Sequence, residues 1–195
     1  MSIGIVACGA IATHLAAISS RHNLDVKIYP LPPLLHNHPE KIAHEVDQLL
    51  SKIESDHDRC VVAYADCGTY GALDAVIERR GISRLRGNHC YDIFAGKEEL
   101  DQIMSNQPGT YFLTDYLLKS FQRSVIVELG LDRRPELRDD YFKNYTQVLW
   151  LAQNYTPALE EEAQAAAALI RLPLSIKIVG EGGLEKQLLS LVNNA

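Results

Sequence analysis

Short apolar runs alternate with amphipathic stretches along most of the chain, and this pattern predicts a parallel α/β fold. The runs of strand length and character are residues 3–7, 24–29, 60–65, 82–85, 145–151 and 174–179. The stretches with the apolar spacing of one-sided helices are residues 10–20, 39–53, 68–80 and 158–171. Strands that alternate with helices favour a mostly parallel, doubly wound sheet with right-handed crossovers and helices on both faces.

Proline and glycine mark the ends of some of these elements. Pro39 suits the first turn of the helix over residues 39–53, and Gly81 is placed to end the helix over residues 68–80. Beyond residue 110 the pattern is less regular, and the apolar spacing predicts one long amphipathic helix over residues 111–129. Because no repeat, low-complexity tract or linker interrupts the sequence, we expect a single α/β domain over residues 1–195.

Composition narrows the classes of protein that fit. The chain has 195 residues, 47% of them hydrophobic and 23% charged, which is ordinary for a globular protein. A net charge of −6 argues against a nucleic acid or an anionic membrane as the main partner. The apolar N-terminal run carries no basic segment, and no run approaches the ~18 apolar residues of a membrane span. We therefore expect a cytoplasmic protein whose four cysteines stay reduced.

Three of the four cysteines lie at or shortly after the end of a predicted strand. Cys8, Cys67 and Cys90 hold these positions, and His36 follows a fourth strand in a proline-rich loop. Because the carboxyl ends of parallel strands line one crevice, we expect these four side chains to converge. Thiolates with one imidazole suit Zn²⁺ or an iron centre, so the sequence predicts a metal site made of Cys8, His36, Cys67 and Cys90.

Neighbouring residues have both a functional and a structural interpretation. His89 and Asp66 are candidate catalytic groups for acid–base chemistry, while Gly9 and Gly68 would let a cofactor approach the backbone closely. The structural alternative is that Asp66 complements the dipole of the following helix, and that a single cysteine is only a small buried hydrophobe. Cys60 begins a strand at the opposite edge, so we expect it to belong to the core.

At these residues the chain resembles a family known as domain of unknown function 1638. The resemblance rests on four motifs within roughly residues 3–150: Cys8-Gly9, His36-Asn-His-Pro39, Tyr64-Ala-Asp-Cys67-Gly68 and Arg86-Gly-Asn-His-Cys90. The chain departs from the family where His89 stands in place of a frequent aspartate. Members look to be encoded near corrinoid-dependent methyltransferases, so the resemblance implies, without assigning a reaction, a role in one-carbon or methyl-group metabolism.

Three functional hypotheses follow. In the first, zinc held by the four ligands activates a thiolate or a water for methyl-group chemistry. In the second, the chain is a non-catalytic accessory protein that holds an iron–sulfur cluster or a corrinoid for a corrinoid protein or methyltransferase partner. In the third, it is a metal-free enzyme in which Cys67 or Cys90 is the nucleophile and His89 the base. Each hypothesis expects a small-molecule or cofactor ligand.

Overall fold

The computed structural model describes residues 2–193, and the chain divides into two compact units, each with its own three-stranded parallel sheet. The first unit runs to Ile93 and resumes at Gly182, and the second is Phe94–Glu181. The strands are β1 (Ile3–Cys8), β2 (Val26–Leu31), β3 (Arg59–Ala63), β4 (Thr110–Thr114), β5 (Gln147–Ala152) and β6 (Leu174–Ile178). The α-helices are α1 (Ala12–Arg21), α2 (Pro39–Ile53), α3 (Ala72–Arg80), α4 (Cys90–Ala95), α5 (Lys97–Asn106), α6 (Asp115–Lys119), α7 (Arg138–Phe142), α8 (Pro157–Leu169) and α9 (Gly182–Asn193).

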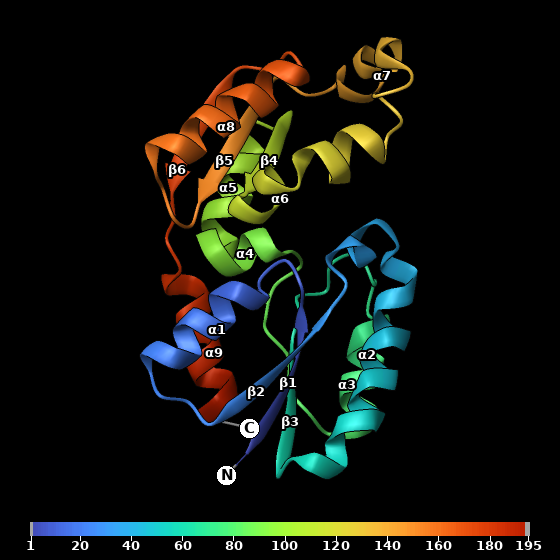
Figure 1. Ribbon diagram of the computed structural model, residues 1–195, viewed down its shortest axis with the longest axis vertical. Helices are drawn as coiled ribbons and strands as arrows, with labels where there is room; N and C mark the ends of the chain where they lie inside the picture. Colours follow the sequence, from blue (N-terminus) through green and yellow to red (C-terminus); the bar gives the residue numbers. More distant parts are fainter. Residues whose placement is uncertain (1, 194–195) are drawn as a thin grey trace. The chain divides into compact units, whose positions relative to one another are not determined.

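The first unit is a doubly wound sheet with the strand order β2-β1-β3. Every residue of the central strand β1 is buried, as its unbroken apolar sequence predicts for a strand covered on both faces. Helices α1 and α9 cover one face of this sheet, and α2 and α3 cover the other (Figure 1). Helix α2 turns its apolar positions inward: Ile42, Val46, Leu50 and Ile53 are buried.

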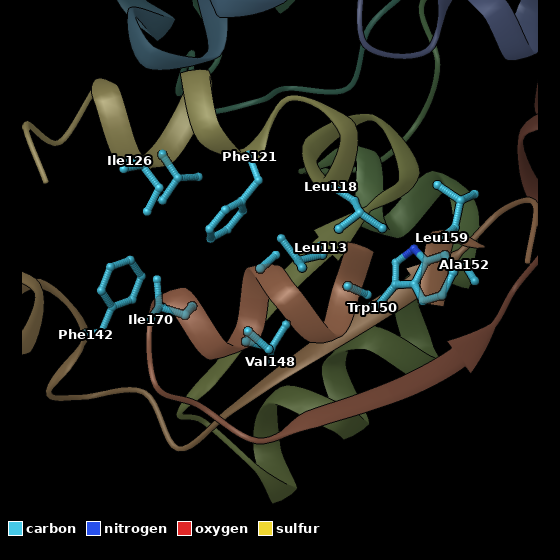
Figure 2. Packing of buried hydrophobic residues seen from close by; sticks show 14 of the residues in the cluster. Leu113, Leu118, Phe121, Ile126, Phe142, Val148, Trp150, Ala152, Leu159 and Ile170 are labelled. Atoms are coloured by element: carbon cyan, nitrogen blue, oxygen red, sulfur yellow. The ribbon is translucent and has the colours of Figure 1, made fainter. Parts of the chain in front are cut away.

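The second unit has the strand order β4-β5-β6 and its own hydrophobic core. Figure 2 shows apolar side chains of β4, β5, α6 and α8 in this core, with the fully buried Trp150 at one side, near Leu159 and Ala152. The carboxylate of Asp115, which is 3% exposed, accepts hydrogen bonds from the indole N–H of Trp150 at 2.9 Å and from the backbone N–H groups of Gln153 and Asn154 at 3.1 and 2.7 Å. These contacts fix the start of α6 to the end of β5.

The parallel α/β fold is confirmed, but two predicted elements are wrong. Residues 110–114 form strand β4 and not the start of a helix over residues 111–129, because Thr114 ends the strand and caps α6 at once by accepting a hydrogen bond from the N–H of Leu117. Residues 82–85 make one isolated bridge, between Val62 and Arg84, and no strand. The single domain expected over residues 1–195 stays a prediction; within it the structure has two compact units with separate sheets.

Several other features agree with the sequence pattern. Pro39 stands at the first position of α2, and Gly81 ends α3 with a left-handed backbone (φ 62°). A 3-10 turn, Pro33–Asn37, connects β2 to α2. The remaining short turns are η2 (Glu54–Asp56), the π-helical turn η3 (Gln122–Val127) and η4 (Pro135–Leu137). No helix within residues 2–193 combines the length and the apolar character that a membrane crossing needs.

Candidate thiol and imidazole site

Four predicted ligands lie at the carboxyl edge of the first sheet. Cys8 is the last residue of β1, His36 lies in the 3-10 turn after β2, and Cys67 is in the loop that leaves β3. Cys90 is the first residue of α4, and its segment is tied to the Cys67 loop because the backbone N–H of Cys67 donates to the carbonyl of Asn88 at 2.7 Å. Cys60 instead pairs with Gly4 near the amino end of β1, as expected for a core residue.

The imidazole of His36 stands beside the thiols in a fixed orientation. Its Nδ1 lies 3.0 Å from the carbonyl oxygen of Pro33, which can only accept a hydrogen bond, so Nδ1 carries a proton and Nε2 is the basic nitrogen of the neutral ring. The Sγ atom of Cys8 is 3.9 Å from Nδ1 and 3.8 Å from Nε2. Because these distances are nearly equal, the thiol sits beside the ring and not on the line of one nitrogen lone pair.

The pKa of His36 is set by opposing effects. Burial lowers this pKa, but a hydrogen bond and charge interaction with Cys67, together with the Pro33 carbonyl, outweigh burial and raise it above its ordinary value. The ring of His36 therefore contacts Cys8, and its pKa responds to Cys67. Such an imidazole can serve as a metal ligand through Nε2 or as a partner for a thiolate.

The thiols of Cys8 and Cys90 are held in their protonated forms by desolvation. Burial raises the pKa of Cys8 from 9.0 to about 11, although backbone N–H groups of Ala10 and Ile11 act in the opposite direction. Burial also raises the pKa of Cys90, and the charges of Cys67 and Cys8 add to that shift. A cation brought to this cluster would reverse the balance by stabilising the thiolates.

Tyr64 is a member of the site that the sequence analysis did not single out as functional. It directly follows β3, is fully buried, and its ring stacks on that of His36 with centroids 6.2 Å apart and planes inclined by 20°. Burial and the nearby Cys8 and Cys67 raise the pKa of its hydroxyl. Although Tyr64 and Cys8 are close enough to influence each other, the hydroxyl makes no hydrogen bond of normal geometry within residues 2–193. The available signal was a buried strand-end tyrosine three residues before Cys67, since such a hydroxyl needs a partner.

Asp66 shapes the loop that carries Cys67. Its carboxylate accepts hydrogen bonds from the hydroxyl of Thr69 at 2.7 Å and from the backbone N–H groups of Tyr70 and Gly71 at 3.2 and 3.1 Å. Burial raises the pKa of Asp66, but these hydrogen bonds outweigh burial and lower it. Cys67 itself adopts a left-handed backbone (φ 51°), which is uncommon for a residue with a side chain. The contacts of Asp66 match the structural alternative, in which it caps the turn before α3.

His89 and Asp92 occupy the turn that leads to Cys90. The carboxylate of Asp92 is buried and accepts hydrogen bonds from the backbone N–H groups of Asn88 and His89 at 2.5 and 3.1 Å. The side chain of His89 is exposed, and its ring lies 6.3 Å from that of Tyr91. Of the two histidines considered for the site, His36 is therefore the one whose contacts with the thiols are observed.

The two candidate cofactor-binding glycines lie at close approaches of the backbone. A side chain at Gly9 would place a Cβ atom 2.4 Å from the carbonyl oxygen of Leu31, so only glycine lets the turn after Cys8 pass so close to the turn that carries His36. Gly68 has a φ of 83°, and a Cβ there would stand 3.4 Å from Pro39. Gly9 is therefore required by a close approach of two turns, whereas Gly68 is favoured by its left-handed backbone, since a Cβ at 3.4 Å from Pro39 would be in ordinary contact.

The site combines soft ligand atoms with a low-polarity surrounding. Among residues 2–193, no three side chains of His, Cys, Asp or Glu are arranged to hold a metal ion together. The donor set nonetheless fits a soft metal in its chemistry, with up to three sulfur atoms and one nitrogen whose ring partner fixes the tautomer. The fold and this edge define an α/β protein with a cluster of cysteines and one histidine at the end of a parallel sheet.

Comparison with known families places the chain in one of them. The profile of the family described as "Protein of unknown function (DUF1638)" matches residues 30–188, so the chain belongs to this family. The matched span contains His36, Cys67 and Cys90, whereas Cys8 precedes it. A search of curated proteins found no match, and a search of solved structures found none either.

Proposed function

We propose that this protein binds a soft metal ion, with zinc favoured, through Cys8, His36, Cys67 and Cys90, and uses the site in methyl-group chemistry. The observation that carries the proposal is the contact of the His36 ring with the Sγ atom of Cys8 at 3.8 Å, with Nδ1 anchored on the carbonyl of Pro33, and the effect of Cys67 on the pKa of His36 supports it. The thiols of Cys8, Cys67 and Cys90, which lie at the same edge of the sheet, would supply the remaining ligand atoms.

Binding requires the protein to change the state of its own groups. Cys8 and Cys90 must each release a proton, and the side chains must close around the ion from the separations seen here. A bound zinc ion would supply Lewis acidity and a thiolate of raised nucleophilicity at neutral pH. The protein would hold the ligand groups in position. The carbonyl of Pro33 orients His36, and the backbone hydrogen bond between Cys67 and Asn88 holds the loops of Cys67 and Cys90 together.

Metal analysis of protein purified without oxygen tests the proposal. We expect about one metal ion per chain, from the number of available ligands. Cys67→Ser and Cys90→Ser should each lower the metal content, because a hydroxyl is a poor substitute for a soft thiolate. Cys60→Ser is the matched control and should leave the content unchanged, since Cys60 lies beside Gly4 at the other end of the strands. Full retention of metal in a Cys8, Cys67, Cys90 triple variant would refute the proposal.

Optical absorption separates zinc from the alternative occupants. A zinc-loaded protein is colourless, whereas an iron–sulfur cluster or a corrinoid absorbs visible light. Colour that follows the metal or cofactor content through purification would therefore favour an accessory protein that serves a methyltransferase partner.

A second candidate function is favoured by the interaction between His36 and Cys67. Cys67 raises the pKa of His36, which is the arrangement of a thiolate paired with an imidazolium in a metal-free cysteine enzyme. In that case His36, and not His89, would be the base. Rapid alkylation of Cys67 by iodoacetamide in metal-free protein, slowed strongly by His36→Ala, would support this candidate over the metal site.

A further inference from the structure

The edge that β6 forms in the second sheet is open to pairing with another strand, whereas the other sheet edges are protected. The outer edge of β2 carries Pro30, which has no N–H group, and the outer edge of β3 is bridged by Arg84. Strand β4 is largely buried, and Thr110 and Thr114 are each 6% exposed. Strand β6, in contrast, pairs with β5 alone within residues 2–193, and its last residue, Ile178, is 66% exposed. Such an edge is a template for another strand.

The backbone of β6 presents alternate residues to this edge. The N–H of Val148 donates to the carbonyl of Pro173 at 2.8 Å, and the N–H of Val179 donates to the carbonyl of Ala152 at 2.9 Å. Because backbone groups alternate in direction along a strand, the odd-numbered residues of β6 face β5 and the even-numbered residues face outward. The outward-facing residues are Leu174, Ile176 and Ile178.

We propose that β6 pairs with β6 of a second copy of this chain, antiparallel and about a twofold axis at Ile176. In this register Ile176 faces its own counterpart, and Leu174 of each copy faces Ile178 of the other. The residues that meet are the outward-facing ones, so the members of each pair exchange backbone hydrogen bonds in both directions. The contact joins two three-stranded sheets into one continuous sheet with a self-complementary interface.

The side chains of β6 select a second copy as the occupant, because the sequence Leu-Ser-Ile-Lys-Ile is complementary to itself when reversed. Ile178 is mostly exposed and Leu174 is partly exposed, so their pairing covers apolar surface at both ends of the contact. On the opposite face of the strand, Lys177 of each copy meets Ser175 of the other, so no like charges stand directly opposite.

Lys177 does not protect the edge as an unpaired lysine would. A lysine on an edge strand commonly opposes pairing because its charge must stay in water. The ammonium group of Lys177 forms an ion pair with the carboxylate of Glu99 in its own chain. Its charge is therefore already balanced within the second unit when another strand approaches.

Sedimentation equilibrium of the full chain over a range of concentrations tests the proposal. We expect a wild-type dimer and at least about tenfold weaker dimerisation of Ile178→Lys, which removes two apolar pairs and adds a charge at each. Leu169→Lys is the matched control and should leave the dimer unchanged, because Leu169 is an apolar residue of α8 that is 49% exposed. A monomeric wild-type protein, or an equal effect of the two variants, would overturn the proposal and leave the edge to a strand of another protein.

Two further variants at one position keep the test decisive if Ile178→Lys fails to fold. Ser175→Lys should weaken the dimer, because it places a like charge opposite Lys177 in both symmetric positions. Ser175→Glu should retain the dimer or strengthen it, since it places an opposite charge there. Both variants lose the same hydrogen bond from Ser175 to Gln147, so a difference between them reports the charge at the contact. Equal dimerisation of the two variants overturns the proposal.

Disulfide cross-linking tests the register. Ser175→Cys and Lys177→Cys proteins are oxidised separately and as a mixture, and the native thiols give the same background in all three samples. The two positions form a non-hydrogen-bonded pair with Cα atoms about 4.5 Å apart, close enough for a disulfide. Like positions are diagonal neighbours, about 7–8 Å apart. The mixture should therefore give most of the cross-linked dimer, and equal cross-linking in the three samples overturns the proposed pairing.

Discussion

The carbonyl oxygen of Pro33 holds Nδ1 of His36 at 3.0 Å, within one 3-10 turn. This contact leaves Nε2 as the basic nitrogen of the neutral ring and fixes the imidazole beside the thiols of the site. The orientation is set by the local chain and needs no metal. The site is thus partly formed before any ligand arrives.

Substitution of His36 and substitution of His89 should have different effects on the zinc content of the protein. His36→Ala should lower the zinc content of the protein, whereas His89→Ala should leave it unchanged, because His36 contacts the thiols and His89 is exposed. Both variants, and the protein after chelation, should stay folded, since the first sheet is already covered on both faces by helices. Metal analysis and circular dichroism melting curves measure both effects, and collapse of the fold on chelation would make the metal structural.

Cys8 should make the stability of the metal-free protein depend on alkaline pH. Because burial raises its pKa from 9.0 to about 11, the stabilisation is fully present below 9.0 and is lost as the pH rises through about 11. Two pKa units correspond to about 2–3 kcal/mol of unfolding free energy. Urea denaturation at about pH 8 and about pH 11 should show a smaller loss for Cys8→Ala than for wild type. Equal losses would mean that the Cys8 thiol ionises freely in the folded state.

Gly9→Ala should disturb the site through the backbone. The new Cβ would lie 2.4 Å from the carbonyl oxygen of Leu31, so the turns carrying Cys8 and His36 must move apart, at a cost of about 1–3 kcal/mol in unfolding free energy. Gly182→Ala is the control, because no atom lies within 4 Å of the added Cβ, and it should stay within about 0.5 kcal/mol of wild type. Thermal melts measure both, and similar values for the two variants would contradict the observed packing.

Asp115 should be the most sensitive polar residue of the second unit. Asp115→Ala removes an acceptor shared by the Trp150 indole and two backbone N–H groups, so the expected loss is about 3–5 kcal/mol in unfolding free energy. Asp132→Ala, at an exposed position whose ion pair with Arg133 is 3.7 Å long, should change stability by less than about 0.5 kcal/mol. Denaturant unfolding followed by Trp150 fluorescence compares them, and a small effect at Asp115 would show that water replaces the carboxylate.

The strand-end positions of Cys8, His36 and Cys67 could be predicted because parallel strands of one sheet share an edge. The division into two sheets could not be predicted from the sequence, because strand order depends on contacts between residues far apart in the chain. The misassigned stretch after residue 110 has a local cause: Leu113, Leu117 and Leu118 fit helical spacing, while the strand ends and the helix starts at Thr114 without a loop. Tyr64 could not be identified as a functional residue from the sequence, because a tyrosine within an apolar run is typical of the hydrophobic core.

The backbone hydrogen bonds from Asp66 to Gly87 and from Cys67 to Asn88 join two loops through main-chain atoms only. Because neither bond involves a side chain, the spacing between the segments that carry Cys67 and Cys90 does not depend on what stands at position 88, whose side chain is exposed. Protein engineers can therefore vary the side chain at position 88 to tune access to the thiols, provided that proline, which lacks the N–H donor, is kept out of position 67 and out of position 88, whose N–H donates to Asp92.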